Sequence, residues 1–367
     1  MARLHIGFIG LGLIGGSIAR ALRENRSEVY MTAYDVNAAT LKAALQDGVI
    51  DRATEQIDER FADCDYLFLC APVQKNDANL EVVKKVISPS CTLTDVGSVK
   101  TDIHRHIVQA GLEAQFIGGH PMAGSERFGY ANSKARLLEN AYYILTPTEQ
   151  TDPKRLEAYR ALVESMGAIP LILDYRQHDY VTAGISHLPH VIAASLVNLV
   201  RDSDNEEGIM KLVAAGGFKD ITRIASSSAA MWQQICLTNT ENISRLLGSY
   251  IDSLSAIKDQ LDTRQGDALY QLFDSARVYR DSFINASSGP IKRVYSFNID
   301  IDDRPGMLAQ VATTLAFNNI NIKNIGIVHN REYEEGVLRI EFYDETSQEA
   351  AKQLLSTPQF VIHEKKM

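Results

Sequence analysis

The sequence predicts an α/β protein with three domains. Over residues 1–173, apolar strand-like runs alternate with helical runs, which is typical of a doubly wound parallel sheet. Residues 174–290 carry long helical patterns with few β runs and predict an all-helical second domain. Residues 293–367 return to short strands around two helices, in the order βαββαβ. A chain of 367 residues is long enough for each domain to bury its own core.

The first strand and helix carry a dinucleotide-binding pattern. The apolar run Leu4–Ile9 leads into a glycine turn and a helical run. The first glycine permits the tight turn, the second lets a pyrophosphate approach the backbone, and the third lets the helix pack on the strand. The next strand, Val29–Tyr34, ends in Asp35, whose carboxylate is placed to bond ribose hydroxyls and would repel a 2′-phosphate. These features predict a Rossmann-like NAD-binding domain, with the turn formed by Gly10, Leu11, Gly12, Leu13, Ile14 and Gly15.

Further strands are expected to end beside this turn. Their apolar runs cover residues 66–70, 91–95 and 116–117, and two more strands are expected at 141–145 and 169–173. In an open α/β sheet, ligands bind beyond the carboxyl ends of the strands. The pattern therefore gathers a cofactor-binding segment and two candidate catalytic residues at one crevice: Ala71, Pro72, Val73, Ser98 and His120.

His120 is the candidate general base. An unperturbed histidine has a pKa of roughly 6.5 and accepts a proton at physiological pH. The glycines on both sides of it permit close approach of a ligand. A structural histidine in a turn is the alternative for this segment taken alone.

The helical segment offers candidate substrate-binding residues. His187 and His190 lie three positions apart with a proline between them, and either one alone is equally well explained as structural. Arg223 follows a glycine pair, and its planar donors match a carboxylate bidentately, although a surface helix charge is the alternative. The only tryptophan of the chain, Trp232, comes next.

The C-terminal segment begins after a predicted linker, Ser287–Pro290. Strands are expected at 294–301, 320–328, 335–342 and near Val361, with helices at 307–318 and 347–355. This order resembles the ACT domain, a ferredoxin-like module that binds free amino acids. The alternative is a packing domain without a ligand. The resemblance places an effector site at Asp303, Arg304, Pro305, Gly306, Met307, Leu308 and Asn321.

Composition excludes several other classes of function. The net charge is −9 and no basic cluster is present, which disfavours nucleic acid and anionic membranes as partners. The first strand begins almost at Met1, leaving no room for a signal peptide, and the apolar run Val191–Val200 is too short to span a bilayer. A cytoplasmic location is expected. No metal is expected either, because the cysteines lack metal-ligand spacing and fit buried thiols: Cys64, Cys70, Cys91 and Cys236.

In combination these motifs resemble the prephenate dehydrogenase family, in the form that carries a C-terminal ACT domain. The resemblance extends over nearly the whole chain and rests on the glycine turn and on four further segments: Asp95–Lys100, Gly119–Gly124, His187–His190 and Phe218–Ile224. It implies NAD-dependent oxidative decarboxylation of prephenate to 4-hydroxyphenylpyruvate, a step toward tyrosine.

The resemblance also implies roles for the candidate residues. His120 would take the proton of the ring hydroxyl, and Ser98 would bond to His120 or to that hydroxyl. Arg223 would bind a substrate carboxylate, His190 and less firmly His187 would contact the side chain, and Trp232 would pack the site wall. Two acidic residues either form a network that gates the cleft or are surface charges: Glu126 and Asp220.

Regulation and assembly follow from the same resemblance. Tyrosine is the expected effector of the ACT domain. A homodimer is expected, with higher assembly through the ACT domains as an option.

Three other functions stay open. The substrate is arogenate if the side chain carries an amino group instead of a keto group. A β-hydroxyacid dehydrogenase of the 6-phosphogluconate type would need a catalytic lysine early in the helical domain, where the segment His187–His190 lies instead. A non-catalytic sensor of NAD and an amino acid is the third.

Overall fold

The computed structural model describes residues 3–26, 28–125, 127–284, 295–301, 304–328, 337–356 and 360–363. The chain forms two compact units, Met1–Gln265 and Gly266–Met367. The domain boundaries expected at 173/174 and at 290/293 stay predictions. The predicted linker Ser287–Pro290, the effector residue Asp303 and the gating residue Glu126 lie outside the described residues.

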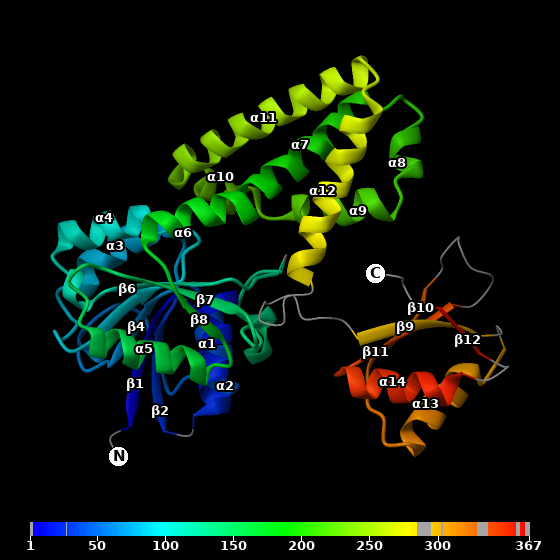
Figure 1. The fold of residues 1–367 in the computed structure, drawn as a ribbon. Helices are drawn as coiled ribbons and strands as arrows, with labels where there is room; N and C mark the ends of the chain where they lie inside the picture. The colour runs from blue at the N-terminus through cyan, green and yellow to red at the C-terminus, as the bar shows by residue number, and fades with distance from the viewer. Residues whose placement is uncertain are drawn as a thin grey trace. The chain divides into compact units, whose positions relative to one another are not determined.

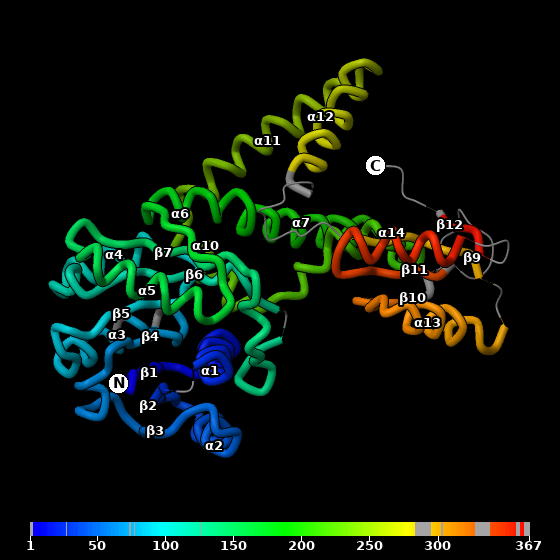
Figure 2. The backbone as a smooth tube through the Cα atoms, turned by 60° about the horizontal axis from the view of Figure 1, so that its bottom comes forward, coloured from blue at the N-terminus to red at the C-terminus, as the bar shows by residue number. Residues whose placement is uncertain are grey.

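A parallel sheet in the order β3-β2-β1-β4-β5 forms the centre of the first unit (Figures 1 and 2). Ile6 and Phe8 pack on one face under α1, α2 and α5, whereas Ile9 and Leu67 pack on the other under α3 and α4. Helices on both faces confirm the doubly wound prediction. The strands are β1 (Leu4–Ile9), β2 (Val29–Tyr34), β3 (Arg52–Thr54), β4 (Tyr66–Leu69) and β5 (Thr92–Asp95), and the helices are α1 (Leu13–Asn25), α2 (Ala38–Gln46), α3 (Val73–Val83), α4 (Thr101–Ala110) and α5 (Pro153–Ser165).

A second sheet, in the order β6-β7-β8, continues from β5, because a parallel bridge joins Leu93 to Phe116. Its strands are β6 (Ile117–Pro121), β7 (Tyr142–Pro147) and β8 (Ile169–Ile172). β6 runs antiparallel to β7, so the parallel sheet predicted over residues 1–173 is wrong for this part of the chain.

The prediction that the strand ends at Ile117, before the glycine-flanked His120, is wrong, because β6 continues through Pro121. The glycines serve close packing instead. A Cβ on Gly119 would lie 2.7 Å from the carbonyl oxygen of Asp95, and one on Gly118 would collide with Thr146.

The rest of the first unit is helical, as predicted. A continuous helical stretch consists of α6 (Tyr175–Thr182), a π-helical turn (Ala183–His187) and α7 (Leu188–Ser203). It is followed by α8 (Ile209–Val213), α9 (Gly216–Thr222), α10 (Ala229–Thr238) and α11 (Thr240–Asp262). Helix α9 packs against α7.

The stretch Tyr175–Ser203 is long and apolar enough to cross a membrane by length and composition alone. The expectation that no apolar run is long enough to span a bilayer considered only Val191–Val200, so it does not hold for the whole stretch by length and composition. A single helix of this kind is weak evidence for a membrane span, because core helices of soluble proteins pass the same test. Its polar residues His178 and Asp179 are buried and hydrogen-bonded within the unit, so this end of the helix packs against protein.

The second unit begins with α12 (Gly266–Ile284). Its described strands form an antiparallel sheet in the order β10-β11-β9-β12, with a core that includes Ile299, Val311, Leu338 and Leu355. The predicted βαββαβ order is confirmed by β9 (Tyr295–Asp300), α13 (Met307–Phe317), β10 (Ile322–Val328), β11 (Val337–Phe342), α14 (Glu345–Leu355) and β12 (Val361–His363).

Candidate active site

The glycine turn between β1 and α1 has the shape that a dinucleotide requires. Gly10 has φ +96°, and a Cβ on it would lie 2.8 Å from the backbone nitrogen of Ala71. A Cβ on Gly15 would lie 2.7 Å from the carbonyl oxygen of Gly10, whereas one on Gly12 would meet nothing within 4 Å. Gly12 precedes α1 without a side-chain cap, so the first N–H groups of the helix have no capping side chain. The open position beside an uncapped helix N-terminus fits a pyrophosphate.

Asp35 follows β2 at the edge of this turn. Its Oδ2 accepts a hydrogen bond from the backbone N–H of Leu11 at 2.7 Å, and its Oδ1 accepts one from Asn37 at 2.8 Å. Each carboxylate oxygen has a second lone pair, so Asp35 is held in place and can still accept from ribose hydroxyls. Ala71 and Pro72 directly precede α3, on the far side of Gly10.

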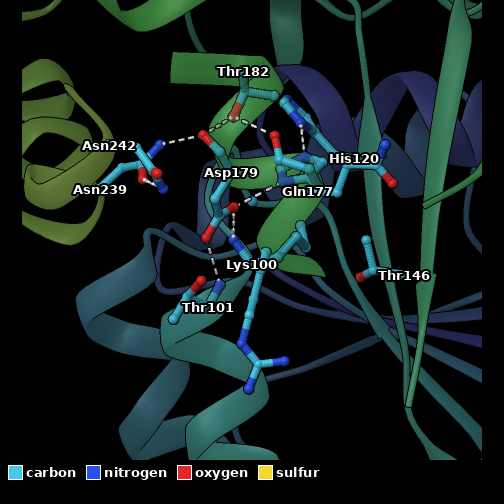
Figure 3. Close-up of polar contacts among 12 residues, drawn as sticks. Lys100, Thr101, His120, Thr146, Gln177, Asp179, Thr182, Asn239 and Asn242 are labelled. Carbon is cyan, nitrogen blue, oxygen red and sulfur yellow. Dashed lines mark hydrogen bonds and ion pairs between the residues drawn. The ribbon is translucent and has the colours of Figure 1, made fainter. Parts of the chain in front are cut away.

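His120 lies on β6 with 8% of its surface exposed. Its Nδ1 lies 2.7 Å from Nε2 of His178, and Nδ1 of His178 lies 2.8 Å from Oδ1 of Asp179. The carboxylate of Asp179 also accepts hydrogen bonds from the backbone N–H groups of Lys100 and Thr101, both at 2.7 Å (Figure 3). Helix α6 thus holds His120 through a series of two side chains, Asp179 and His178.

This series assigns the protons on both imidazoles. Burial raises the pKa of Asp179, but hydrogen bonds from His178, Thr101 and Lys100 outweigh it and leave the pKa below its usual value. An ionised carboxylate only accepts, so Nδ1 of His178 carries a hydrogen and its Nε2 has the lone pair. Nδ1 of His120 must then donate, which leaves the lone pair of His120 on Nε2.

The charge state of His120 suits a base. Burial, followed by the nearby His178 and Lys100, holds the pKa of His120 well below its usual value. His120 is therefore neutral at physiological pH, with an unprotonated Nε2.

Lys100 fixes the backbone beside His120. Its side chain is fully buried, its Nζ forms an ion pair with Asp95, and it donates to the carbonyl oxygen of Gly119 at 2.7 Å. Asp95 in turn accepts from the N–H of Gly119 at 3.2 Å. Burial lowers the pKa of Lys100, and Asp95 opposes that shift. The carbonyl and the N–H of Gly119, the residue before His120, are therefore both held by hydrogen bonds from buried side chains.

A second group of predicted residues gathers where the π-helical turn meets α10. The ring of His190 stacks on Trp232 with centroids 3.6 Å apart, and the ring of His187 meets Trp232 edge-on at 5.9 Å. Nδ1 of His187 lies 3.1 Å from Nδ2 of Asn239. Burial lowers the pKa of His187 to about 4 and also lowers that of His190. Asn239 also donates to the backbone oxygen of Asp179 at 2.8 Å, so the two groups lie near one another.

Three further predicted residues are Ser98, Asp220 and Arg223. Ser98 is half-buried in the segment after β5, and no hydrogen bond between Ser98 and His120 is found in the part of the chain that the structure describes. Asp220 and Arg223 are exposed, on α9 and on the turn that follows it. The roles of these three residues stay predictions.

Comparison with known proteins identifies the family. A family model for the prephenate dehydrogenase nucleotide-binding domain matches residues 18–171, and one for the prephenate dehydrogenase dimerization domain matches residues 174–275. The chain is 37% identical to the prephenate dehydrogenase of Bacillus subtilis over 348 residues, which is 94% of each chain. The chain belongs to the prephenate dehydrogenase family.

Solved structures agree with this family. The prephenate dehydrogenase from A. aeolicus, solved in complex with hydroxyphenyl propionate and NAD+, is 32% identical with a TM-score of 0.73, covering 77% of this chain and 99% of that one. A Synechocystis arogenate dehydrogenase is 30% identical with a TM-score of 0.69, covering 76% and 100%. As a member of the prephenate dehydrogenase family, the protein is an NAD-dependent oxidoreductase.

Sequence reasoning missed His178, Asp179, Lys100 and Asn239. Their contacts with the site span 52 or more positions along the chain, except for that of Lys100 with Gly119. The sequence offers no clear signal for His178 and Asp179, because they end a run of four polar residues, Arg176–Asp179, of which Arg176 and Gln177 are exposed. Lys100 lies in the motif Asp95–Lys100, but the sequence alone assigns it no role.

Proposed function

We propose that this protein oxidises prephenate with NAD+ and releases CO2, giving 4-hydroxyphenylpyruvate for tyrosine synthesis. The observation that carries the proposal is the series Asp179–His178–His120, which leaves a lone pair on Nε2 of a neutral, buried histidine. The likeness to the B. subtilis prephenate dehydrogenase supports the substrate.

The reaction requires one proton acceptor from the protein. When bound, NAD+ accepts the hydride from the ring carbon that carries the hydroxyl. Nε2 of His120 takes the hydroxyl proton, so the ring gains a carbonyl. The ring carboxylate then leaves as CO2, and its electron pair enters the ring and makes a phenolate. The imidazolium of His120 returns the proton to the phenolate oxygen, so the base is regenerated and no net proton is released.

The substrate side chain would lie toward the second histidine group. His187 and His190 both contact Trp232, and α9, which leads into Arg223, packs against α7. In this proposal Arg223 binds a carboxylate that keeps its charge throughout, so its loss raises KM. Ser98 bonds to the substrate hydroxyl, since Nδ1 of His120 is occupied by His178. Asp220, with Glu126, either gates the cleft or is a surface charge.

The C-terminal unit would be the regulatory ACT domain, with tyrosine as its effector. Its βαββαβ order agrees with that module. Arg304, Pro305, Gly306 and Met307 line a hollow of about 370 Å³, and Gly306 has φ +93° at the start of α13. Asn321 lines a second hollow on the same unit, and Leu308 is partly exposed. Tyrosine would inhibit by favouring one conformation over another.

A homodimer in the cytoplasm is the proposed form of the enzyme. The segment matched by the dimerization-domain model exposes apolar side chains that a single chain leaves uncovered. Pairing of ACT domains would allow higher assembly. The exposed apolar residues include Ile185, Leu199, Leu212, Leu237 and Ile251.

Arogenate is the second candidate substrate, because a solved relative with a TM-score of 0.69 is an arogenate dehydrogenase. The deciding experiment measures NADH formation from NAD+ with prephenate or arogenate, each with and without tyrosine. Turnover of prephenate that tyrosine suppresses supports both parts of the proposal. Turnover of arogenate alone changes the substrate, and NAD+ binding without any turnover supports the sensor.

A further inference from the structure

His187 holds a buried nitrogen that the protein itself does not use. The residue is 1% exposed, and its Nε2 has no hydrogen-bond partner among the described residues. Leaving a buried polar atom unpaired costs about 1–3 kcal/mol, so such an atom calls for an explanation. It lies in the group that also contains His190 and Trp232.

Asn239 determines the hydrogen on that nitrogen. A carbonyl oxygen only accepts, so the atom of Asn239 that lies 2.8 Å from the backbone oxygen of Asp179 must be its amide nitrogen. Its oxygen, on the other side, accepts from Asn242 at 2.9 Å, which fixes the same orientation (Figure 3). The second hydrogen of the amide nitrogen points to Nδ1 of His187 at 3.1 Å. Nδ1 of His187 therefore has the lone pair, and the hydrogen lies on Nε2.

The unpaired Nε2 of His187 is thus a donor in a neutral ring, because burial lowers the pKa of His187 to about 4. A second unpaired donor is close to it. Nε1 of Trp232 is buried without a partner in the described part of the chain, and an indole N–H only donates. Two donors suit the oxygen atoms of a keto acid. An ammonium group has no lone pair, so it cannot accept a hydrogen bond from Nε2 of His187 or Nε1 of Trp232.

We propose that Asn239 is a specificity-determining residue, which holds His187 as a hydrogen-bond donor to the keto oxygen of the substrate side chain and so disfavours the amino analogue. This inference rests on the proposed function, since it concerns the side chain of prephenate. Asn239 acts through His187 and is a positioning residue. Its effect should appear as a change in the ratio of kcat/KM between prephenate and arogenate.

The test compares Asn239→Leu, His187→Phe and a control, Asn25→Leu, at an exposed residue outside the site. We expect wild-type enzyme to prefer prephenate, and both site variants to lose about 3- to 10-fold of that preference, mainly through a higher KM for prephenate. The control should keep the wild-type ratio. Thermal unfolding of each variant verifies its fold, and if Asn239→Leu does not fold, His187→Phe decides.

A second measurement observes the proton directly. Nitrogen-15 NMR of labelled histidine distinguishes the two neutral tautomers, and the signal absent from His187→Phe identifies the residue. Protonation on Nε2 in the wild type, with a mixture in Asn239→Leu, supports the inference. Protonation on Nδ1 overturns it, as does an unchanged substrate ratio in folded site variants of an enzyme that oxidises prephenate. No turnover of prephenate by the wild type refutes the proposed function instead, and the tautomer measurement still tests the role of Asn239.

Discussion

Replacement of His178 by leucine tests whether the Asp179–His178 pair prepares the base. Both ring nitrogens of His178 are used, one toward His120 at 2.7 Å and one toward Asp179 at 2.8 Å. In His178→Leu the Nδ1–H of His120 loses its acceptor while remaining buried. Its proton can move to Nε2, which turns the base into a donor. Keeping the productive tautomer then costs about 1–3 kcal/mol, the penalty for an unpaired buried donor.

That penalty corresponds to a fall in kcat of about 5- to 150-fold. His178→Gln is the matched variant, because its amide oxygen can accept from His120 and should restore part of the rate. Initial rates of NADH formation at saturating prephenate give kcat, and the KM for NAD+ should stay near the wild-type value because His178 does not contact the glycine turn. Thermal unfolding reports whether either variant is misfolded.

Two results would refute this reasoning. A folded His178→Leu enzyme with kcat within twofold of wild type would show that His120 needs no partner at Nδ1. Equal losses in His178→Leu and His178→Gln would show that packing, and not hydrogen bonding, is what the position supplies.

Three further predictions follow from the same geometry. His120→Asn should abolish turnover while NAD+ affinity, measured by titration calorimetry, stays nearly unchanged, and retention of most of kcat would contradict the base assignment. Gly12→Ala should fold normally but bind NAD+ more weakly, because the added Cβ enters the open space at the turn that the pyrophosphate would occupy. Gly10→Ala should lower the melting temperature, because Gly10 has φ +96° and a Cβ there would meet the backbone of Ala71. Equal melting temperatures of the two variants would contradict this. Burial lowers the pKa of His104 and His187 to about 4, so the unfolded chain takes up protons first as the pH falls below 6.5. The free energy of unfolding from urea titrations should therefore be highest above pH 6.5 and decrease toward pH 4, by up to about 3 kcal/mol for each histidine, and a value independent of pH would disprove it.

Local patterns were sufficient to predict much of the fold. The glycine turn, the parallel strands and the βαββαβ order depend on apolar periodicity and turn chemistry within short segments, and the structure confirms them. The end of β6 was mispredicted because the apolar run stops at Ile117, and Gly118 and Gly119 follow it. Glycine is needed at these two positions because Asp95 and Thr146, on other strands, lie too close for a Cβ. Sequence alone does not place these two residues there.

The candidate site was predictable only in part, for a related reason. His120 was predicted as the base from its motif, but its partner His178 lies 58 positions away, on α6. The pairing depends on how α6 packs beside β6. No spacing rule connects two such residues, so only the folded chain shows which nitrogen of His120 carries the proton.

Asp179 connects the two histidine groups of the site. Its side chain accepts from the first N–H groups of α4 and, through His178, fixes the proton of His120. Its backbone oxygen orients the amide of Asn239, which fixes the proton of His187. In the proposed mechanism, one residue on α6 therefore presents a base at one end of the substrate and a donor at the other. Because buried donors and acceptors without partners are costly, the two assignments support each other, and a change at Asp179 should disturb both ends together.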